Sequence, residues 1–148
     1  LAVRFSNGNR FIARPGSEKS ARSFSAVTLL LEDEASRVLD DLYNSVRPML
    51  AVSNGRHVLM STPFGKRGHF FRLWNEQRDL WEWYEIPVEK CPRISPEFLA
   101  EEKRTNPWFE QEYHCVFMET NDSVFTFEQV AATVSNEVEP LLIEVPEW

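Results

Sequence analysis

Acidic side chains follow directly on an apolar segment at residues 29–34, which read Leu-Leu-Leu-Glu-Asp-Glu. The run at residues 26–31 favours β-structure and lacks polar alternation, which predicts a strand covered on both faces. Ligands of open α/β sheets bind beyond the carboxyl ends of the strands. There, one carboxylate can help to hold Mg²⁺ while a second orients an attacking water. Asp33 and Glu34 are candidates for these roles, and a solvated acidic loop is the alternative.

Hydroxyl side chains end the next apolar segment, where Ser61 and Thr62 follow residues 57–60. If the two strands are neighbours, these hydroxyls lie beside the acidic pair and can bond to a phosphate oxygen. A polar end to a strand is the alternative. Arg22 lies in a loop before the acidic segment, from which an arginine can reach a phosphate in its own subunit or in a neighbour. Taken alone, Arg22 is an ordinary surface arginine, and only the neighbouring motif favours a role for it.

A phosphate-binding loop of the form G-x-x-x-x-G-K-[ST] does not occur in the 148 residues, and the only Gly-Lys pair is Gly65-Lys66. Basic residues cluster after the second strand end, and they can either contact DNA phosphates or form a solvated surface. This basic patch consists of Lys66, Arg67, His69 and Arg72. His57 and His114 have no companions at ligand spacing, so neither receives a role.

The elements that must position these side chains form a strand, helix and strand. Between the two apolar segments, hydrophobic residues recur at helical spacing from Leu39 to Leu50, with two acids at the positive end of the helix. This order predicts a parallel crossover unit whose helix packs on the sheet. Before it, residues 2–5 and 10–13 flank an Asn-Gly pair, which predicts a hairpin with a tight primed turn.

Shorter elements are expected after the crossover unit. A helix is predicted to begin at residues 70–74 and a strand to occupy residues 81–88. Ser95-Pro96-Glu97 and Asn106-Pro107 are typical helix starts. Residues 115–118 are predicted to form a short strand. Residues 119–148 show no strong period and are interpreted as a linker.

The composition suits one hydrophobic core, because 43% of the 148 residues are hydrophobic. A net charge of −7 argues against a free-standing nucleic-acid binder that works by phosphate neutralisation. The charge is uneven, at +5 for residues 1–72 and −12 for residues 73–148, so the halves either face different partners or differ in solvated helix faces.

No apolar run spans a membrane and no signal peptide is evident, which predicts a soluble, cytoplasmic protein. Cys91 and Cys115 are expected to be reduced packing residues.

Several ordered segments between residues 5 and 125 resemble the large terminase subunit of tailed bacteriophages, an ATP-driven DNA-packaging motor. They are SARSFS at 20–25, LLLEDEA at 29–35, DLYNSVRPML at 41–50, STPFGKRG at 61–68, CPRISPEFL at 91–99 and QEYHCVF at 111–117. The resemblance implies an α/β fold, namely part of a P-loop NTPase (ASCE-type) parallel sheet with flanking helices, followed by a small lid subdomain. Residues 1–75 would belong to the ATPase core, 76–120 to the lid, and 121–148 to a linker toward a nuclease domain.

Functional roles follow from the same resemblance. Asp33 and Glu34 match the family's Walker B magnesium-binding and catalytic carboxylates, Ser61 and Thr62 match its coupling motif, and Arg22 falls where some members place a trans-acting arginine finger. The implied cofactors are ATP and Mg²⁺. The implied partners are double-stranded DNA, a portal protein, a small terminase subunit and further copies of the chain in a ring, in the cytoplasm of a bacterial host and without a membrane.

Two parts of such a motor are missing from these residues, since the family's phosphate loop lies upstream and its nuclease domain downstream of the matching segments. The chain is therefore expected to be a middle portion with weak or absent nucleotide binding and no activity alone. The hypothesis is a fragment that, in the full protein, couples ATP hydrolysis to DNA translocation. A fragment of a helicase-type P-loop ATPase and a non-catalytic prophage remnant are the alternatives.

Overall fold

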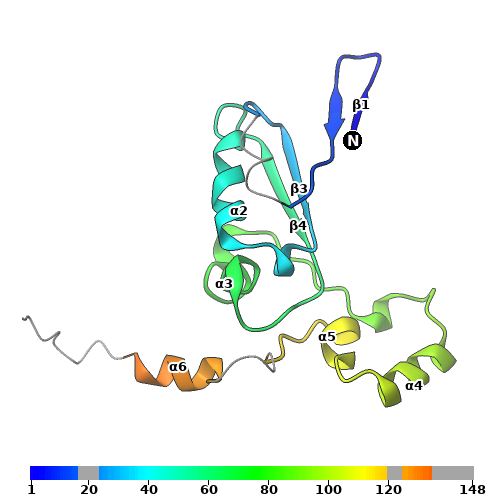
Figure 1. The fold of residues 1–148 in the computed structure, drawn as a ribbon. Coiled ribbons are helices and arrows are strands. Elements are labelled where there is room, and N and C mark those ends of the chain that lie inside the picture. Colours follow the sequence, from blue (N-terminus) through cyan, green and yellow to red (C-terminus); the bar gives the residue numbers. More distant parts are fainter. Residues whose placement is uncertain (17–23, 120–124, 135–148) are drawn as a thin grey trace, which may run out of the picture. The chain divides into compact units, whose positions relative to one another are not determined.

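The computed structural model describes residues 1–16, 24–119 and 125–134. The chain divides into two compact units, Leu1–Met118 and Glu119–Trp148. The first unit contains two small sheets and most of the helices, and the second contains a single described helix (Figure 1). Among the residues described, no helix is long and apolar enough to cross a membrane.

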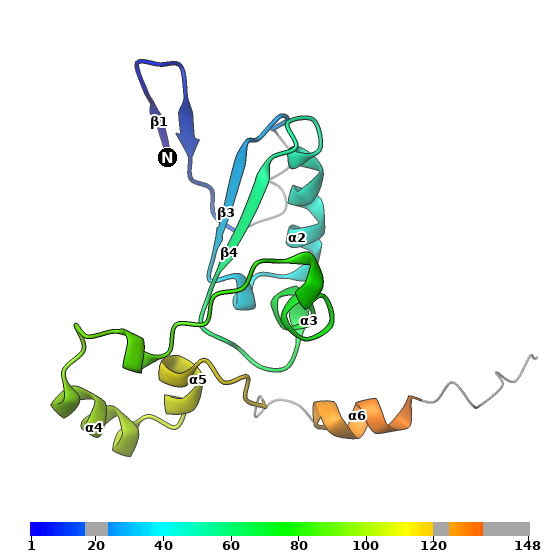
Figure 2. The same cartoon turned by 180° about the vertical axis from the view of Figure 1, so that it is seen from behind.

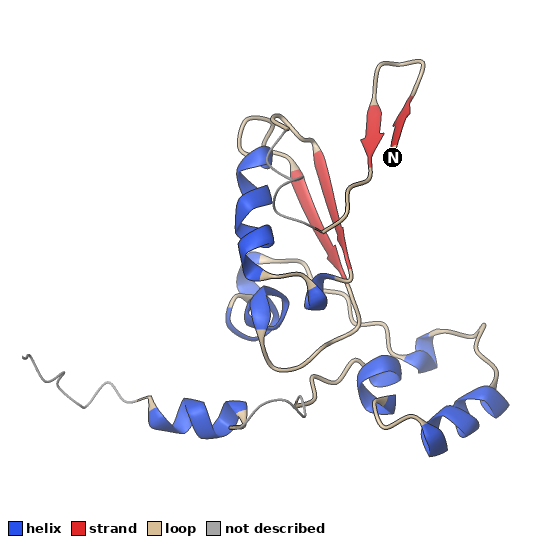
Figure 3. Ribbon diagram, viewed as in Figure 1, coloured by secondary structure: helices blue, strands red, loops and turns tan. Residues whose placement is uncertain are grey.

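A parallel pair of strands forms the centre of the first unit. Strand β3 (Leu29–Asp33) pairs with β4 (Arg56–Met60), with Leu29 opposite Arg56 and Asp33 opposite Met60 (Figure 3). The strands are joined through helices, which confirms the predicted parallel crossover. Strand β3 begins later than the apolar run, because Ala26 adopts a positive φ of 56° and residue 27 instead bonds to the helical segment through Val27 N and Met49 O.

Helix α2 (Asp40–Val46) lies along one face of this pair (Figures 1 and 2). It continues as the 3₁₀ helix η2 (Arg47–Leu50), whose tighter turn accommodates Pro48. Buried Val46 and Met49 form the core here, packed against Phe24, Val27, Leu30 and Leu42. The sequence placed Leu39 within the buried helical stripe, but Leu39 precedes the helix in extended conformation and is 76% exposed.

The opposite face of the strand pair carries exposed apolar side chains. Burial alternates along β3, so Leu30 and Glu32 face α2 while Leu29 and Leu31 are exposed, as is Met60 on β4. The predicted burial of both faces is therefore wrong for the part of the chain that the structure describes. The described helices contact the face that carries Leu30, so no described element covers the face that carries Leu29.

An antiparallel hairpin opens the chain, as predicted, with β1 (Ala2–Arg4) paired to β2 (Arg10–Ile12). Its turn is not of the predicted primed kind, which needs two consecutive residues at positive φ. Gly8 has a φ of 86°, but Asn7 does not share this conformation. The loop is instead closed by bonds from Phe5 N to Asn9 O and from Gly8 N to Phe5 O, a three-residue loop with glycine in the left-handed position.

Helix α3 (Gly68–Glu76) follows β4 after a loop, where the sequence predicted a helix. The short 3₁₀ helices η3 (Arg78–Leu80) and η4 (Val88–Lys90) come next. The strand predicted at residues 81–88 is wrong, because no described strand pairs with this segment. Trp83 packs on α3 instead, with its ring 4.8 Å from that of Trp74, and the Trp81 ring lies 5.7 Å from His57 of β4. Their apolar spacing reflects this packing rather than a pleated strand.

The two predicted helix starts are confirmed. Ser95 Oγ accepts a hydrogen bond from Phe98 N at the start of α4 (Pro96–Thr105), and Asn106 Oδ1 accepts one from Trp108 N before α5 (Phe109–His114). The strand predicted at residues 115–118 does not form, and Cys115 ends α5 with a φ of 59°. As expected, neither Cys91 nor Cys115 is in a disulfide.

The second unit contains a helix that the sequence interpretation missed, α6 (Phe127–Thr133). Thr126 Oγ1 accepts a bond from Gln129 N, and the Gln129 side chain accepts one from Thr126 N. This reciprocal capping box satisfies two backbone donors at the start of the helix. The Thr-x-x-Gln spacing was the available sequence signal.

Candidate functional site

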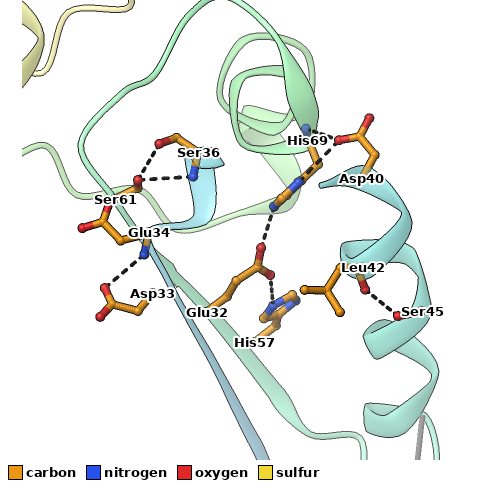
Figure 4. Close-up of polar contacts among 10 residues, drawn as sticks. All are labelled: Glu32, Asp33, Glu34, Ser36, Asp40, Leu42, Ser45, His57, Ser61 and His69. Carbon is orange, nitrogen blue, oxygen red and sulfur yellow. Dashed lines mark hydrogen bonds and ion pairs between the residues drawn. The ribbon is translucent and has the colours of Figure 1, made fainter. Parts of the chain in front are cut away.

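Asp33, Glu34 and Ser61 meet at the carboxyl edge of the β3–β4 pair. Asp33 lies opposite Met60, so the residue that follows each strand emerges at the same edge. Both acids are exposed, and Glu34 leaves the strand in the left-handed conformation, with a φ of 53°. Glu34 N donates to Asp33 Oδ1 at 3.1 Å (Figure 4). This turn points the two adjacent carboxylates in different directions, as a division of roles between them requires.

A pair of serines joins the two strand ends. Ser36, in the 3₁₀ helix η1 (Ala35–Arg37), has its Oγ 2.7 Å from Ser61 Oγ, and Ser36 N donates to Ser61 Oγ at 3.2 Å (Figure 4). Thr62 follows as a half-buried residue. The sequence interpretation missed Ser36, whose only signal was a hydroxyl residue soon after the acidic pair.

Arginines lie beside the acidic edge. Arg37 Nε is 3.8 Å from Glu34 Oε2, and the Arg37 guanidinium carbon lies 3.9 Å from the centre of the Phe64 ring. Arg67 approaches the same ring at 5.8 Å. Because Arg37 and Glu34 are both exposed, their ion pair adds little stability. The ring instead provides a flat support that keeps a guanidinium near Glu34.

The acidic edge suits a magnesium ion that arrives with a nucleotide. Mg²⁺ in such sites takes one or two carboxylates, phosphate oxygens and waters rather than a closed protein cage. One oxygen of exposed Asp33 accepts from Glu34 N, which leaves the other oxygen available as a hard ligand. Within the described ranges, no cluster of three or more His, Cys, Asp or Glu side chains forms a cage of its own.

Beneath this edge lies a buried polar cluster that the sequence did not reveal. Glu32 faces inward from β3, and its side chain is 10% exposed. Its Oε1 is 2.8 Å from His69 Nε2, and its Oε2 is 3.2 Å from His57 Nε2 (Figure 4). The Tyr43 ring stacks on His69 at 4.2 Å between ring centres. Both carboxylate oxygens of Glu32 thus lie close to imidazole nitrogens of α3 and β4, and the contact with His57 has hydrogen-bond geometry.

Asp40 extends this cluster to the first residue of α2. Its Oδ1 accepts from His69 N at 2.7 Å, and its Oδ2 forms a 2.7 Å ion pair with Arg72. Burial tends to raise the pKa of Asp40, but the bonds from Arg72 and His69 outweigh it and lower that pKa. In the same way, burial tends to raise the pKa of Glu32, and the contacts of His57 and His69 lower it overall. The native surroundings therefore favour both ionised carboxylates.

The predicted basic patch is corrected by this geometry. His69 is 1% exposed and belongs to the buried cluster, and Arg72 is paired with Asp40, so neither is a free surface cation. Arg67 is exposed at the Phe64 ring. His57, which received no role from the sequence, is a partner of Glu32. The missed signal is the strand alternation, which puts Glu32 on the same face as Leu30. Arg22 lies outside the described residues.

The parallel pair with its crossover helix defines the class of protein as an α/β fold. A structure of the large terminase ATPase domain of Thermus phage P74-26, an arginine-to-alanine mutant, superposes with a TM-score of 0.51 at 18% identity. The match covers 78% of this chain and 56% of that one, so the present chain spans about half of that domain. At this identity the likeness shows the fold.

The family is given by a second comparison. The family model for the N-terminal part of the T4likevirus-type terminase large subunit matches residues 2–132. The chain therefore belongs to the terminase large subunit family. A search of curated proteins finds no match to this chain.

Proposed function

We propose that this chain carries the carboxylate half of an ATP-hydrolysing site that drives DNA translocation in a packaging motor. Asp33 holds the magnesium ion of the nucleotide, and Glu34 orients the attacking water. The observation that carries the proposal is the in-register pairing of β3 and β4, which brings Asp33, Glu34 and Ser61 to one edge. Family membership supports the terminase hypothesis over the helicase-type alternative.

The chemistry assigned to these residues is positioning and charge stabilisation. A magnesium ion bound with the nucleotide neutralises charge that develops on the transferring phosphoryl group. Asp33 offers an exposed oxygen for that ion, while Glu34, turned away by its left-handed backbone, accepts a hydrogen bond from the water. The exposure of both carboxylates leaves room for nucleotide and water.

Ser61 and Thr62 are proposed to sense the phosphate and couple it to movement. The Ser61 hydroxyl contacts both the backbone and the side chain of Ser36, two residues after Glu34. A hydroxyl bonded to a phosphate oxygen on one side and to this segment on the other links the nucleotide state to the Glu34 backbone. This link supports a coupling role.

Family membership supports the proposals for the rest of the motor. The 148 residues hold no phosphate-loop motif, and we propose that another part of the motor supplies the donors for the β and γ phosphates. Arg22 is proposed as the arginine that stabilises transferring charge, in cis or in trans. Residues 1–75 are proposed to belong to the ATPase core, 76–120 to a lid and 121–148 to a linker. Double-stranded DNA, a portal protein, a small terminase subunit and further copies of the chain are the proposed partners.

The test is ATP turnover by the intact gene product with Glu34→Gln. This change keeps the size of the side chain but removes the general base, so kcat is expected to fall about 10²- to 10³-fold. Glu101→Gln, at an exposed position on α4, is the matched control and should leave turnover unchanged. The chain of residues 1–148 alone should give no magnesium-dependent turnover.

Normal turnover with Glu34→Gln would show that the catalytic assignment is wrong. Absence of ATP turnover by the intact unmodified gene product would instead favour the non-catalytic alternative. Turnover by residues 1–148 alone that Glu34→Gln abolishes would place the phosphate donors within this chain.

A further inference from the structure

The buried Glu32 cluster joins four elements immediately behind the acidic edge. Glu32 belongs to β3, His57 to β4, His69 to α3 and Asp40 to α2. The closest approaches are 2.8 Å between Glu32 and His69 and 2.7 Å between His69 N and Asp40 (Figure 4). Burying a carboxylate is costly unless it is paired, and apolar residues of similar size often serve stability equally well. A role beyond stability therefore merits a test.

We propose that Glu32 is a positioning residue, which fixes the orientation of Asp33 and Glu34 through its contacts with His57 and His69. The inference rests on the proposed function, because it assumes that the acidic edge hydrolyses ATP. Glu32 itself does not touch the nucleotide, since its side chain lies on the α2 face while Asp33 lies on the opposite face.

Strand geometry explains how an inward-facing side chain can fix the orientation of an outward-facing one. Successive side chains on a strand point to opposite faces, so the rotation of β3 about its axis fixes both at once. Glu32 Oε2 is hydrogen-bonded to His57 of β4, and Glu32 Oε1 lies 2.8 Å from His69 Nε2 of α3, so the side chain is confined between the two elements. Losing one contact frees the last residues of β3 to rotate, and small displacements of reacting groups are costly in rate.

The contacts of His69 extend this control to the other strand end. Helix α3 starts after the loop that follows Ser61 and Thr62, and Asp40 holds its first turn through His69 N and the Arg72 side chain. The His69 ring lies nearly parallel to Tyr43, with an angle of 11° between them. The buried imidazole is therefore confined by stacking on Tyr43 and can serve as a rigid stop for Glu32.

The same residues do not form a metal site. Glu32 already touches each imidazole directly, at distances that leave no space for an ion between them. The described residues also include no converging group of three potential ligands. Positioning by direct contact is the role that fits this geometry.

The experiment compares Glu32→Gln with Asp41→Asn in the intact gene product. Asp41 is an exposed neighbour of Asp40 on α2 and serves as the control. Three quantities are measured: kcat, KM for ATP, and the stoichiometry with which a non-hydrolysable ATP analogue binds. Glu32→Gln is expected to lower kcat about tenfold, with KM within about twofold and stoichiometry unchanged. Asp41→Asn should match the unmodified protein.

A double variant tests whether Glu32 acts through His69. If it does, Glu32→Gln combined with His69→Gln lowers kcat no further than the larger single effect, because both changes remove the same contact. If the effects of the two substitutions on kcat multiply instead, the proposal that Glu32 acts through His69 is overturned. A loss of kcat matched by an equal loss of binding stoichiometry would also overturn it, since that pattern indicates misfolded protein. If Glu32→Gln does not fold, Asp40→Asn is measured in its place, because Asp40 lies at the half-exposed end of the Glu32 cluster. The expected fall in kcat is then about threefold.

The outcomes also separate this inference from the proposed function. An inactive Glu34→Gln together with a fully active Glu32→Gln would overturn the inference and leave the function standing. A fully active Glu34→Gln would overturn the proposed function, and the positioning role would fall with it.

Discussion

Three consecutive acids illustrate how local environment divides roles among similar residues. Glu32 is buried between two imidazoles, Asp33 is exposed at the strand end, and Glu34 is exposed in a left-handed turn. Strand alternation separates the first from the second, and the turn separates the second from the third. These different surroundings fit the separate roles proposed for the three carboxylates in structure, metal binding and catalysis.

The lowered pKa of Glu32 predicts how stability depends on pH. Burial opposes ionisation, but His57 and His69 lower the pKa overall, so the ionised form is favoured in the folded state. Its stabilisation is present above the ordinary glutamate pKa, about 4.3. It is lost as the pH falls through the lowered pKa of the folded protein. Glu32→Gln should therefore cost about 2 kcal/mol of unfolding free energy at pH 7, and the deficit should shrink in acid.

Urea unfolding at a series of pH values measures this deficit. Asp40, whose pKa is also lowered, remains in both proteins, so the difference between the two curves isolates Glu32. A deficit that stays constant or grows between about pH 5 and about pH 2 would contradict the assignment of the charged form to the folded state.

At the scale of elements, the β3–β4 pair depends on a close turn before β4. A Cβ added to Gly55 would lie 2.1 Å from Val27 O and 2.8 Å from Leu50 Cδ2. Gly55 N also donates to Leu50 O, and Arg56 N to Thr28 O. The start of the pairing between β3 and β4 therefore needs a residue without a side chain at position 55.

Gly55→Ala should consequently destabilise the chain by about 1–3 kcal/mol, because the obstacle is backbone that cannot move without breaking the strand pairing. Gly16→Ala is the matched control, since its added Cβ would meet only Leu42 Cδ2 at an ordinary 3.5 Å. Its effect should stay within about 0.5 kcal/mol. Thermal unfolding monitored by circular dichroism compares the two. Equal melting temperatures would contradict the steric argument.

At the scale of the whole molecule, the apolar face of the strand pair is the notable surface. Leu29, Leu31 and Met60 are each about half exposed on neighbouring strands. Contiguous apolar surface on a sheet promotes association. The chain of residues 1–148 is therefore expected to self-associate as its concentration rises.

Leu31→Thr should reduce this association, because threonine keeps the preference for β-structure while removing apolar area from the face. Leu39→Thr is the control, since Leu39 is 76% exposed but lies outside the sheet face. Light scattering across a concentration series compares the self-association of the two variants. An equal reduction by both changes would show that general surface polarity, rather than this face, controls association.

The sequence alone determined the parts that depend on local pattern. The apolar run ending in acids, the helical spacing after it and the second apolar run predicted the parallel crossover, and the Ser95 and Asn106 start signals predicted two helices. Such features follow from backbone preferences and side-chain period within a few residues. The ordered segments also predicted the terminase family, which the match over residues 2–132 confirms.

Only the tertiary structure decided which polar residues are buried together. Glu32 is 8 positions from Asp40, 25 from His57 and 37 from His69 in sequence, and no spacing rule connects these residues. The tryptophans of residues 81–88 gave a strand-like pattern, yet Trp83 packs on α3, Trp81 lies beside His57, and no described strand pairs with this segment. Contacts between distant elements depend on how the layers close, which local periodicity does not encode. The acidic pair was visible in the sequence, whereas the buried carboxylate behind it became visible only through the fold.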